Sequence, residues 1–177
     1  MKNKLNIGCG NDIRADYVNL DIAKLPGVDV VCDIDNNPLP FDNNSFEYIL
    51  CNDVLEHVNL EKVLKELHRV LVDEGVIEIR VPHFTSSNNY IDPTHKRMFS
   101  FRTFEFFVND TLHNRGYYFD FHFQKVIYSK ITFLSKNPIN WPFMFFVNIN
   151  HNTKKIYEET FFKNIAPAFN IEIKLKK

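Results

Sequence analysis

Two short hydrophobic runs at the start of the chain each lead into residues that suit a bound ligand better than a strand interior. The run 5–7 stops at Gly8 and Gly10, where the missing side chains let a ligand approach the backbone closely. The run 17–20 leads into Asp21, whose carboxylate can accept hydrogen bonds from both hydroxyls of a ribose. Ligands of open α/β sheets gather outside the carboxyl ends of the strands. These two strand ends therefore predict an α/β fold that holds a nucleoside-bearing cofactor.

Three further strands and one helix are predicted in the first half of the chain. Hydrophobic runs predict strands over 28–32, 46–51 and 76–81. Hydrophobic residues recur at helical spacing over 60–71, and Asn59 is a suitable N-cap. We therefore predict a doubly wound, mostly parallel, Rossmann-like sheet.

Two parts of the chain depart from a regular parallel pattern. Alternation of hydrophobic and polar residues predicts strands over 119–124 and 169–175, with a helix over 152–165 between them. Strands of this type predict an antiparallel C-terminal edge. Only six residues separate Gly10 from Tyr17, which is too few for an ordinary parallel crossover, so the first helix is expected to be a single turn or absent.

The composition changes along the chain without a linker. Four of the five glycines lie at or before Gly75, whereas sixteen of the eighteen phenylalanines lie at Phe84 or later, where most are expected to form core. A chain of 177 residues suits one compact domain. We predict a cofactor-binding half over 1–82, a substrate-side insertion over 83–116, and C-terminal strands and a helix over 117–177.

Charge and cysteine content narrow the class of protein. The formal net charge of -1 argues against a main role in binding nucleic acid. Cys9, Cys32 and Cys51 are odd in number and widely spaced, so neither a disulfide framework nor a zinc site is indicated, and a reducing cytoplasm is expected. No signal peptide is visible, and the longest hydrophobic stretch, 141–147, is too short for a transmembrane segment.

Several segments, in order along nearly the whole chain, resemble motifs of class I S-adenosylmethionine-dependent methyltransferases, in particular the small bacterial type 11 domain. These segments are 5–10, Asp21, 32–34, 39–47, 54–58 and 68–71. The resemblance implies S-adenosylmethionine as the cofactor, with Asp21 at the ribose and Asp33 at the adenine. The predicted cofactor site comprises Gly8, Cys9, Gly10, Asn11, Asp21, Ile22, Asp33, Ile34 and Asn52. The chain departs from the family at Asn6, where an acid is usual, and at Asn11 and Asp12, where a third glycine is common.

The segment after the predicted strand 76–81 is the expected place for acceptor chemistry, because it is polar and begins at a strand end. His83 and His95 are candidates for a catalytic base, and Asp92 for orienting one of them. Lys96 or Arg97 would bind an acidic group of the substrate. Two alternatives stay open: the segment is a turn followed by a solvated helix start, or His83, Asp92 and His95 are metal ligands, although their spacing selects no geometry and no metal is expected.

Three other features have structural interpretations. Glu56 and His57 are as consistent with packing and internal hydrogen bonds as with ligand contact. The aromatic segment 141–146 suits the core or a contact between copies of the chain, and less well a membrane interface or a lipid-linked substrate.

The sequence therefore predicts an S-adenosylmethionine-dependent methyltransferase acting on a hydroxyl or amine of a small or saccharide-like acceptor, with a homodimer as a possible assembly. A dinucleotide-dependent oxidoreductase is disfavoured, because Ile13 stands where its third glycine is needed. The second alternative is a non-catalytic module that binds the cofactor as a subunit of an assembly.

Overall fold

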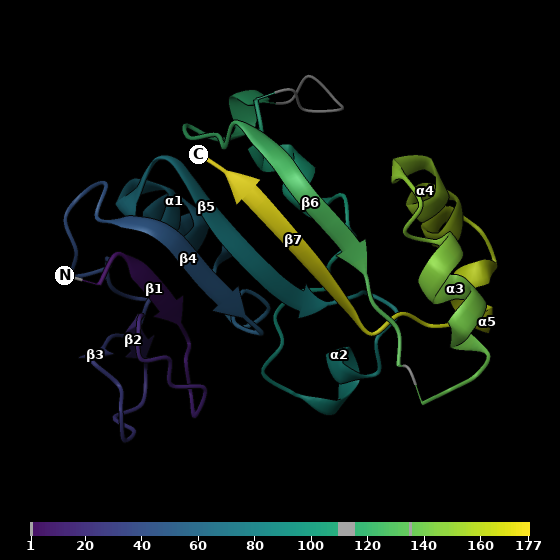
Figure 1. Cartoon of the computed structure of the whole chain (residues 1–177), viewed down its shortest axis with the longest axis horizontal. Helices are drawn as coiled ribbons and strands as arrows, with labels where there is room; N and C mark the ends of the chain where they lie inside the picture. Colours follow the sequence, from purple (N-terminus) through teal and green to yellow (C-terminus); the bar gives the residue numbers. More distant parts are fainter. Residues whose placement is uncertain (1, 110–115, 135) are drawn as a thin grey trace.

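The computed structural model, which describes residues 2–109, 116–134 and 136–177, is built around one seven-stranded sheet (Figure 1). The strands are β1 (Lys4–Ile7), β2 (Val18–Asp21), β3 (Val30–Val31), β4 (Phe46–Asn52), β5 (Leu71–Pro82), β6 (Lys125–Ile131) and β7 (Asn170–Lys176). Their order across the sheet is β3-β2-β1-β4-β5-β7-β6. Strands β1 to β5 pair in parallel, and β7 pairs antiparallel with both β5 and β6. The predicted mostly parallel sheet with an antiparallel C-terminal edge is confirmed.

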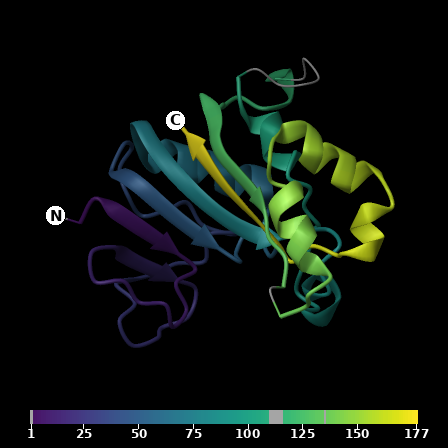
Figure 2. The ribbon, with the colours of Figure 1, turned by 45° about the vertical axis from the view of Figure 1, so that its right-hand side comes forward.

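Helices lie in two places relative to this sheet. They are α1 (Leu60–Val70), α2 (Asn88–Ile91), α3 (Asn140–Phe146), α4 (His151–Glu159) and α5 (Phe162–Ile165), with short 3-10 turns at Thr103–Phe107 and Gly116–Tyr118. Helix α1 lies behind β4 and β5, whereas α3, α4 and α5 group together near β6 and β7 (Figure 1, Figure 2). The predicted start of α1 is confirmed, because the Asn59 side chain accepts a hydrogen bond from the Lys62 amide at 3.1 Å.

Buried amides, rather than a helix, organise the connection from β1 to β2. Asn6 and Asn19 are both 2% exposed, and the Asn6 amide donates to Asn19 Oδ1 at 3.2 Å and to the Asp12 carbonyl at 2.8 Å. Asn19 Oδ1 also accepts from the Arg14 amide at 3.0 Å. These bonds satisfy backbone groups that a helix would otherwise pair. Asn6 therefore holds the glycine loop in place of the acid that is usual at this position.

The two faces of the sheet differ in chemistry. Ile77 and Ile79 of β5 are fully buried on the face covered by α1. Glu78 lies between them in the strand, so its side chain points to the opposite face. There Lys174 of β7 approaches the Glu78 carboxylate to 2.7 Å, and the Tyr48 hydroxyl donates to the same carboxylate. One face therefore forms the hydrophobic core, while the other is held by polar pairs.

The predicted strand over 119–124 is wrong, because the strand at this edge is β6, which begins at Lys125. Phe119 and Phe121 form no ladder; they stack on Phe107 with ring centroids 4.4 and 5.9 Å apart. Phe123 forms a single isolated bridge with Val108. The period-two alternation reflects an extended chain that packs its phenylalanines inward without a strand partner.

Other boundaries also differ from expectation. Strand β3 is only two residues long, shorter than the predicted 28–32, and β5 begins directly after α1, five residues before the predicted 76–81. The predicted helix over 152–165 is two helices, α4 and α5, and the Thr160 amide bonds the Ile156 carbonyl where α4 ends. The division of the chain at residues 82 and 116 stays a prediction, and residues 110–115 of the expected insertion lie outside the described residues.

The segment 141–146 is largely exposed, so it does not form core. Trp141, Phe145 and Phe146 are 63%, 71% and 60% exposed, and only Phe143 packs against the core. Phe161, at the start of α5, is 62% exposed. We call the set of Trp141, Phe145, Phe146 and Phe161 the aromatic surface.

His68 gives the fold a pH dependence of predictable sign. Its ring packs on Phe121 and Phe123, and its Nε2 lies 3.1 Å from the His122 carbonyl. Burial, with the Lys177 charge, lowers the pKa of His68. Because the folded-state pKa lies below the unfolded value of about 6.5, this contribution to stability is complete above about pH 6.5 and is lost as the pH falls below it.

We therefore expect the free energy of unfolding to fall less between about pH 7 and pH 5 in His68→Gln than in the natural chain, because glutamine keeps a donor but takes up no proton. Urea denaturation at both pH values measures the difference. His151→Gln, which replaces a half-exposed histidine beside Glu105, is the control. Identical pH dependence in His68→Gln and the natural chain would contradict the assignment.

Candidate active site

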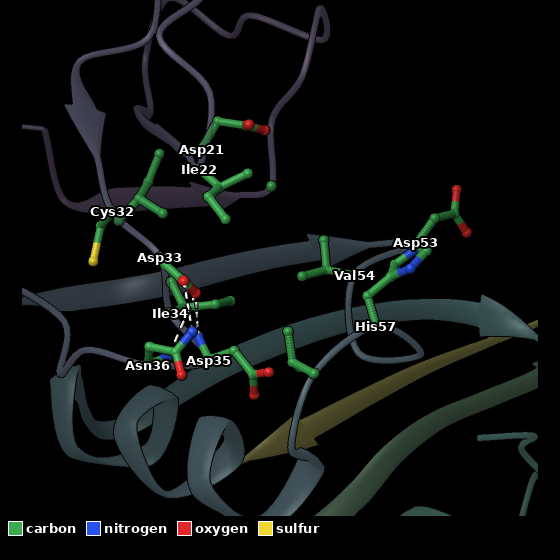
Figure 3. A pocket seen from close by; sticks show the side chains of 13 residues that line it. Asp21, Ile22, Cys32, Asp33, Ile34, Asp35, Asn36, Asp53, Val54 and His57 are labelled. Atoms are coloured by element: carbon green, nitrogen blue, oxygen red, sulfur yellow. Dashed lines mark hydrogen bonds between the residues drawn. The ribbon is translucent and has the colours of Figure 1, made fainter. Parts of the chain in front are cut away.

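A pocket lies at the carboxyl ends of four neighbouring parallel strands, β3, β2, β1 and β4. We call it the first pocket. Figure 3 shows Asp21 and Ile22 on one side of it, the residues from Asp33 to Asn36 opposite them, and Val54 and His57 on a third side. It is lined by Gly8, Leu20, Asp21, Ile22, Cys32, Asp33, Ile34, Asp35, Asn36, Asp53, Val54, His57 and Val58. This is the strand edge at which the sequence predicts ligand binding.

Gly8 is required by space and by backbone geometry. Its φ is +61°, and a Cβ at this position would lie 2.3 Å from Cγ2 of Val54. Valine is stiff about χ1 and cannot swing aside cheaply. Gly10 also has a positive φ, of +47°, but a Cβ there would meet nothing within 4 Å.

The Gly8→Ala variant is therefore expected to lose about 2–5 kcal/mol of unfolding free energy, the sum of backbone strain and overpacking. Gly10→Ala is the matched comparison, and it should lose about 1–2 kcal/mol, from strain alone. Urea denaturation of both variants checks the difference. Equal losses would show that the contact with Val54 does not limit this position.

Hydrogen bonds hold two carboxylates at the mouth of the first pocket. Asp21 accepts from the Gly10 amide at 2.8 Å and from the Ala23 amide at 2.9 Å, one bond to each carboxylate oxygen. Asp33 accepts from the Asn36 side chain at 2.7 Å, and this bond lowers the pKa of Asp33. Each ionised oxygen can accept a further bond, so both groups are preorganised acceptors for a ligand's hydroxyl or amino groups.

The predicted cofactor residues fall into two groups in the structure. Gly8, Asp21, Ile22, Asp33 and Ile34 line the first pocket. The remaining four do not: Cys9 is buried, Asn11 is exposed, Asn52 lies at the end of β4, and Gly10 contributes its amide to Asp21. The lining residues absent from the predicted cofactor site are Leu20 of β2 and seven that follow β3 and β4: Cys32, Asp35, Asn36, Asp53, Val54, His57 and Val58. The strand-end argument, applied to the residues after Asn52, would have found the last four of these.

A second pocket adjoins the first at the carboxyl ends of β4 and β5. It is lined by Asp53, Glu56, His57, Pro82, Asn88, Ile91, Asp92 and His95. Asp53 and His57 line both pockets. The predicted residues Asp92 and His95 are therefore brought together with Glu56 and His57, for which the sequence left packing and ligand contact equally open.

Hydrogen bonds fix the orientation of one histidine in the second pocket. Thr94 Oγ1 donates to Asp92 at 2.6 Å, so it accepts from Nδ1 of His57 at 2.9 Å. His57 Nε2 then carries a lone pair. The His95 ring lies edge-on to the His57 ring, with the ring centroids 4.7 Å apart. Nε2 of His95 is 3.8 Å from the Asp92 carboxylate. Burial is the main cause that lowers the pKa of His57, followed by the neighbouring His95, which favours a neutral imidazole.

Glu56 is a buried carboxylate in this pocket. Its residue is 1% exposed, and neither carboxylate oxygen has a hydrogen-bond partner among the described residues. Burial raises the pKa of Glu56 to about 7. A buried charge without a partner is costly, so Glu56 marks a position where an added proton or cation is stabilising.

Asp53, which lines both pockets, has an unusual backbone conformation. Its φ is +55°, a region that non-glycine residues seldom adopt. The Asp53 amide donates to the Arg80 carbonyl at 2.8 Å, and the Arg80 guanidinium pairs with its carboxylate. Strain of this kind concentrates at functional sites.

His83 has a structural position rather than a catalytic one, which argues against its predicted role as a base. It is fully buried, with Nε2 3.0 Å from Glu158 and Nδ1 2.8 Å from Thr85 Oγ1. Glu158 also accepts from the Phe101 amide at 2.9 Å. His83 therefore ties the end of β5 to α4 and lines neither pocket.

Lys96 is held by contacts at the two pockets, whereas Arg97 is not part of either pocket. Lys96 donates its amide to the Glu56 carbonyl at 2.7 Å and its ammonium to Asp35 at 2.6 Å, so it clamps the segment across the two pockets. Arg97 is exposed and lines neither pocket.

Comparison with known proteins agrees with this geometry. Residues 7–79 match the family model described as a methyltransferase domain. This segment, 73 of the 177 residues, resembles a methyltransferase domain. The matched residues run from the end of β1 into β5 and contain the lining of the first pocket. The resemblance to S-adenosylmethionine-dependent methyltransferases is thereby supported over residues 7–79 by the family model and over almost the whole chain by the fold.

Solved structures match this methyltransferase fold over almost the whole chain. A SAM-dependent methyltransferase from Archaeoglobus fulgidus matches with a TM-score of 0.60 and 19% identity, covering 98% of this chain and 85% of that one. The [4+2]-cyclase SpnF matches with a TM-score of 0.56 and 12% identity, covering 98% of this chain and 73% of that one. At these identities the likeness concerns the fold alone.

One curated relative is similar over a short segment. An uncharacterized protein of Methanocaldococcus jannaschii is 46% identical over 43 residues, which are 24% of this methyltransferase-like chain and 19% of the relative. No helix in the described ranges of the chain has both the length and the hydrophobicity needed to cross a membrane.

Proposed function

We propose that the chain binds S-adenosylmethionine in the first pocket and transfers its methyl group to a hydroxyl or amine of a small or saccharide-like acceptor in the second. The sharing of Asp53 and His57 by the two pockets carries this proposal. Methyl transfer is an in-line displacement, which needs the acceptor and the sulfonium side by side in a fixed orientation. Adjoining pockets at one sheet edge satisfy that requirement.

The cofactor would lie across the strand ends, with its ribose at Asp21 and its adenine at Asp33. The Asp21 carboxylate suits the two ribose hydroxyls, and Ile22 and Ile34 offer hydrophobic contact for a flat base. The methionine end would then point past Gly8 toward His57. This orientation brings the methyl group to the boundary between the pockets.

The acceptor loses a proton as the methyl group arrives. In the proposed step the bond from sulfur to the methyl carbon breaks, the acceptor oxygen or nitrogen bonds that carbon, and the sulfonium becomes a neutral thioether. His57 and His95 are the groups of the second pocket best placed to orient the acceptor and assist loss of its proton. Asp92 would act as a positioning residue, through Thr94 on His57 and by its charge on His95.

Lys96 contributes by holding the segment 92–97 over the boundary, because its ammonium is already paired with Asp35. An acidic substrate group would instead meet Arg97, which is exposed and, unlike Lys96, has no ion pair among the described residues. Substrate contacts of both cations stay predictions, as does a cytoplasmic location.

A measurement of S-adenosylhomocysteine release tests the proposed activity. The protein is incubated with S-adenosylmethionine and a panel of sugars, sugar nucleotides and small amines, and acceptor-dependent product is expected with one class. Bound cofactor without product on any acceptor would favour the second candidate, a non-catalytic binding module. The [4+2]-cyclase SpnF has a similar fold, so the fold alone does not fix methyl transfer as the reaction.

The aromatic surface is a suitable contact for the predicted homodimer. Large aromatic side chains at this exposure are typical of surfaces that pair. If two copies meet there, Phe145→Asp should shift the protein from dimer to monomer in light scattering after size exclusion, with Asp16→Asn as a surface control. A natural chain that is monomeric at high micromolar concentration would contradict the homodimer.

A further inference from the structure

The second pocket gathers three side chains that are common metal ligands. We propose that Glu56, His57 and His95 bind one divalent transition-metal ion beside the cofactor pocket. One donor atom from each residue lies within 4.8 Å of the others. Metal–ligand bonds of about 2.1 Å at tetrahedral angles put donors about 3.4 Å apart, so side-chain movements of about 1 Å would close the set around an ion.

Two of the three ligands have buried donor atoms without partners. Both Glu56 carboxylate oxygens and Nδ1 of His95 lack a hydrogen-bond partner among the described residues. Glu56 is 1% exposed, and the His95 side chain is 8% exposed. Buried polar atoms are nearly always paired in folded proteins, so the coincidence of these atoms in one pocket points to an absent partner. A cation bound between them satisfies all of them at once.

Each histidine has one ring nitrogen directed at an acceptor, at hydrogen-bond distance for His57 and at ion-pair distance for His95. His57 donates a hydrogen bond from Nδ1–H to Thr94 Oγ1, which leaves the Nε2 lone pair available. His95 has Nε2 toward Asp92 at 3.8 Å, which leaves the Nδ1 lone pair toward the pocket. Metal-binding histidines typically direct their second nitrogen to a carboxylate or another acceptor. The Asp92 carboxylate therefore faces His95 directly and is connected to His57 through the Thr94 hydroxyl.

The ligand set indicates the kind of ion. Two imidazoles and one carboxylate suit zinc, cobalt, iron or manganese better than magnesium, which prefers oxygen ligands. Asp53 lines the same pocket, but its carboxylate is paired with Arg80. Three protein ligands leave coordination positions open to the pocket.

Those open positions bear on the choice of acceptor, in a step that rests on the proposed function. An ion there would bind an acceptor hydroxyl and lower its pKa, so that the proton passes to water before or during methyl transfer. In that arrangement the two imidazoles hold the ion and do not act as free bases. A hydroxyl acceptor is then favoured over a protonated amine.

Metal binding by the untagged chain, without S-adenosylmethionine, tests the proposal. Calorimetric titration with Zn²⁺ should show one equivalent bound, Co²⁺ should give visible absorption bands of a site with nitrogen ligands, and Mg²⁺ should bind far more weakly. Glu56→Gln and His95→Gln should each weaken Zn²⁺ binding by more than about 100-fold, and Asp92→Asn by about 10–100-fold, since outer contacts matter less than ligands. His151→Gln, beside Glu105, should bind like the natural chain.

Binding of no Zn²⁺, or binding that persists unchanged in both Glu56→Gln and His95→Gln, would overturn the proposal. Thermal unfolding of each variant without metal shows whether it is folded. Because two ligand variants are used, the test still holds if one of them does not fold. S-adenosylmethionine titration in chelator measures the cofactor site separately, so loss of one site is distinguished from loss of the other.

Discussion

Replacement of Asp21 by alanine is expected to weaken S-adenosylmethionine binding by at least about 100-fold, since each hydrogen bond to a charged group contributes about 1.5–3 kcal/mol and two would be lost. The same carboxylate holds the Gly10 and Ala23 amides, so the glycine loop also loses its anchor. Calorimetric titration of the variant and the natural chain gives the change in affinity directly.

Two comparisons make this prediction specific. Asp16→Ala removes an exposed carboxylate that pairs with Lys4 away from the pocket, and it should leave cofactor affinity unchanged. Asp21→Asn keeps one acceptor oxygen and should lose less affinity than Asp21→Ala. Normal binding by Asp21→Ala would show that the ribose does not lie at the end of β2.

The second large effect is expected at the acceptor side. His95→Ala should lower turnover by at least about 100-fold, the usual range for loss of a group that assists proton transfer, while cofactor affinity stays unchanged. His95 lines the second pocket but not the first, which is the physical reason for the split. Single-turnover methyl transfer at saturating cofactor measures the rate, and calorimetry measures the affinity.

His151→Ala provides the control for this second prediction, because His151 is also a histidine beside a carboxylate but lies on the surface of α4. It should retain both turnover and cofactor affinity. A His95→Ala variant with full turnover would remove His95 from the acceptor site, whatever its effect on stability.

The place of the first pocket could be predicted from sequence because its determinants are local. A hydrophobic run fixes where a parallel strand ends, and Asp21 and Asp33 follow two such runs directly. Strand order then brings the ends together, since β3, β2, β1 and β4 are neighbours in the sheet. The same reasoning stopped too early at Asn52, so Asp53 was left out of the predicted site and His57 stayed open between packing and ligand contact.

The role of His83 could not be predicted because its partner is distant in the sequence. Glu158 lies on α4, seventy-five positions away, and only the packing of α4 brings its carboxylate to the ring. His83 and His95 look alike in sequence, each standing among polar residues after β5. The two histidines differ in burial and in their hydrogen-bond partners, and neither property can be read from the neighbouring residues in the sequence.

The misplaced strand at 119–124 has a related cause. Alternation indicates an extended backbone with one side buried, but it does not say whether a neighbouring strand provides hydrogen bonds. Here Phe121 and Phe123 are buried against His68 of α1, while the ladder with β7 begins only at Lys125. Pairing depends on β7, some fifty residues later in the chain.

Calorimetric titration with S-adenosylmethionine and S-adenosylhomocysteine, with NAD as the comparison ligand, tests the central claim most directly. We expect one equivalent of each of the first two to bind with micromolar affinity and NAD to show no binding, because the loop after Gly8 lacks the third glycine of a dinucleotide site. Binding of NAD, or of neither methionine-derived ligand, would contradict the assignment of the first pocket to S-adenosylmethionine.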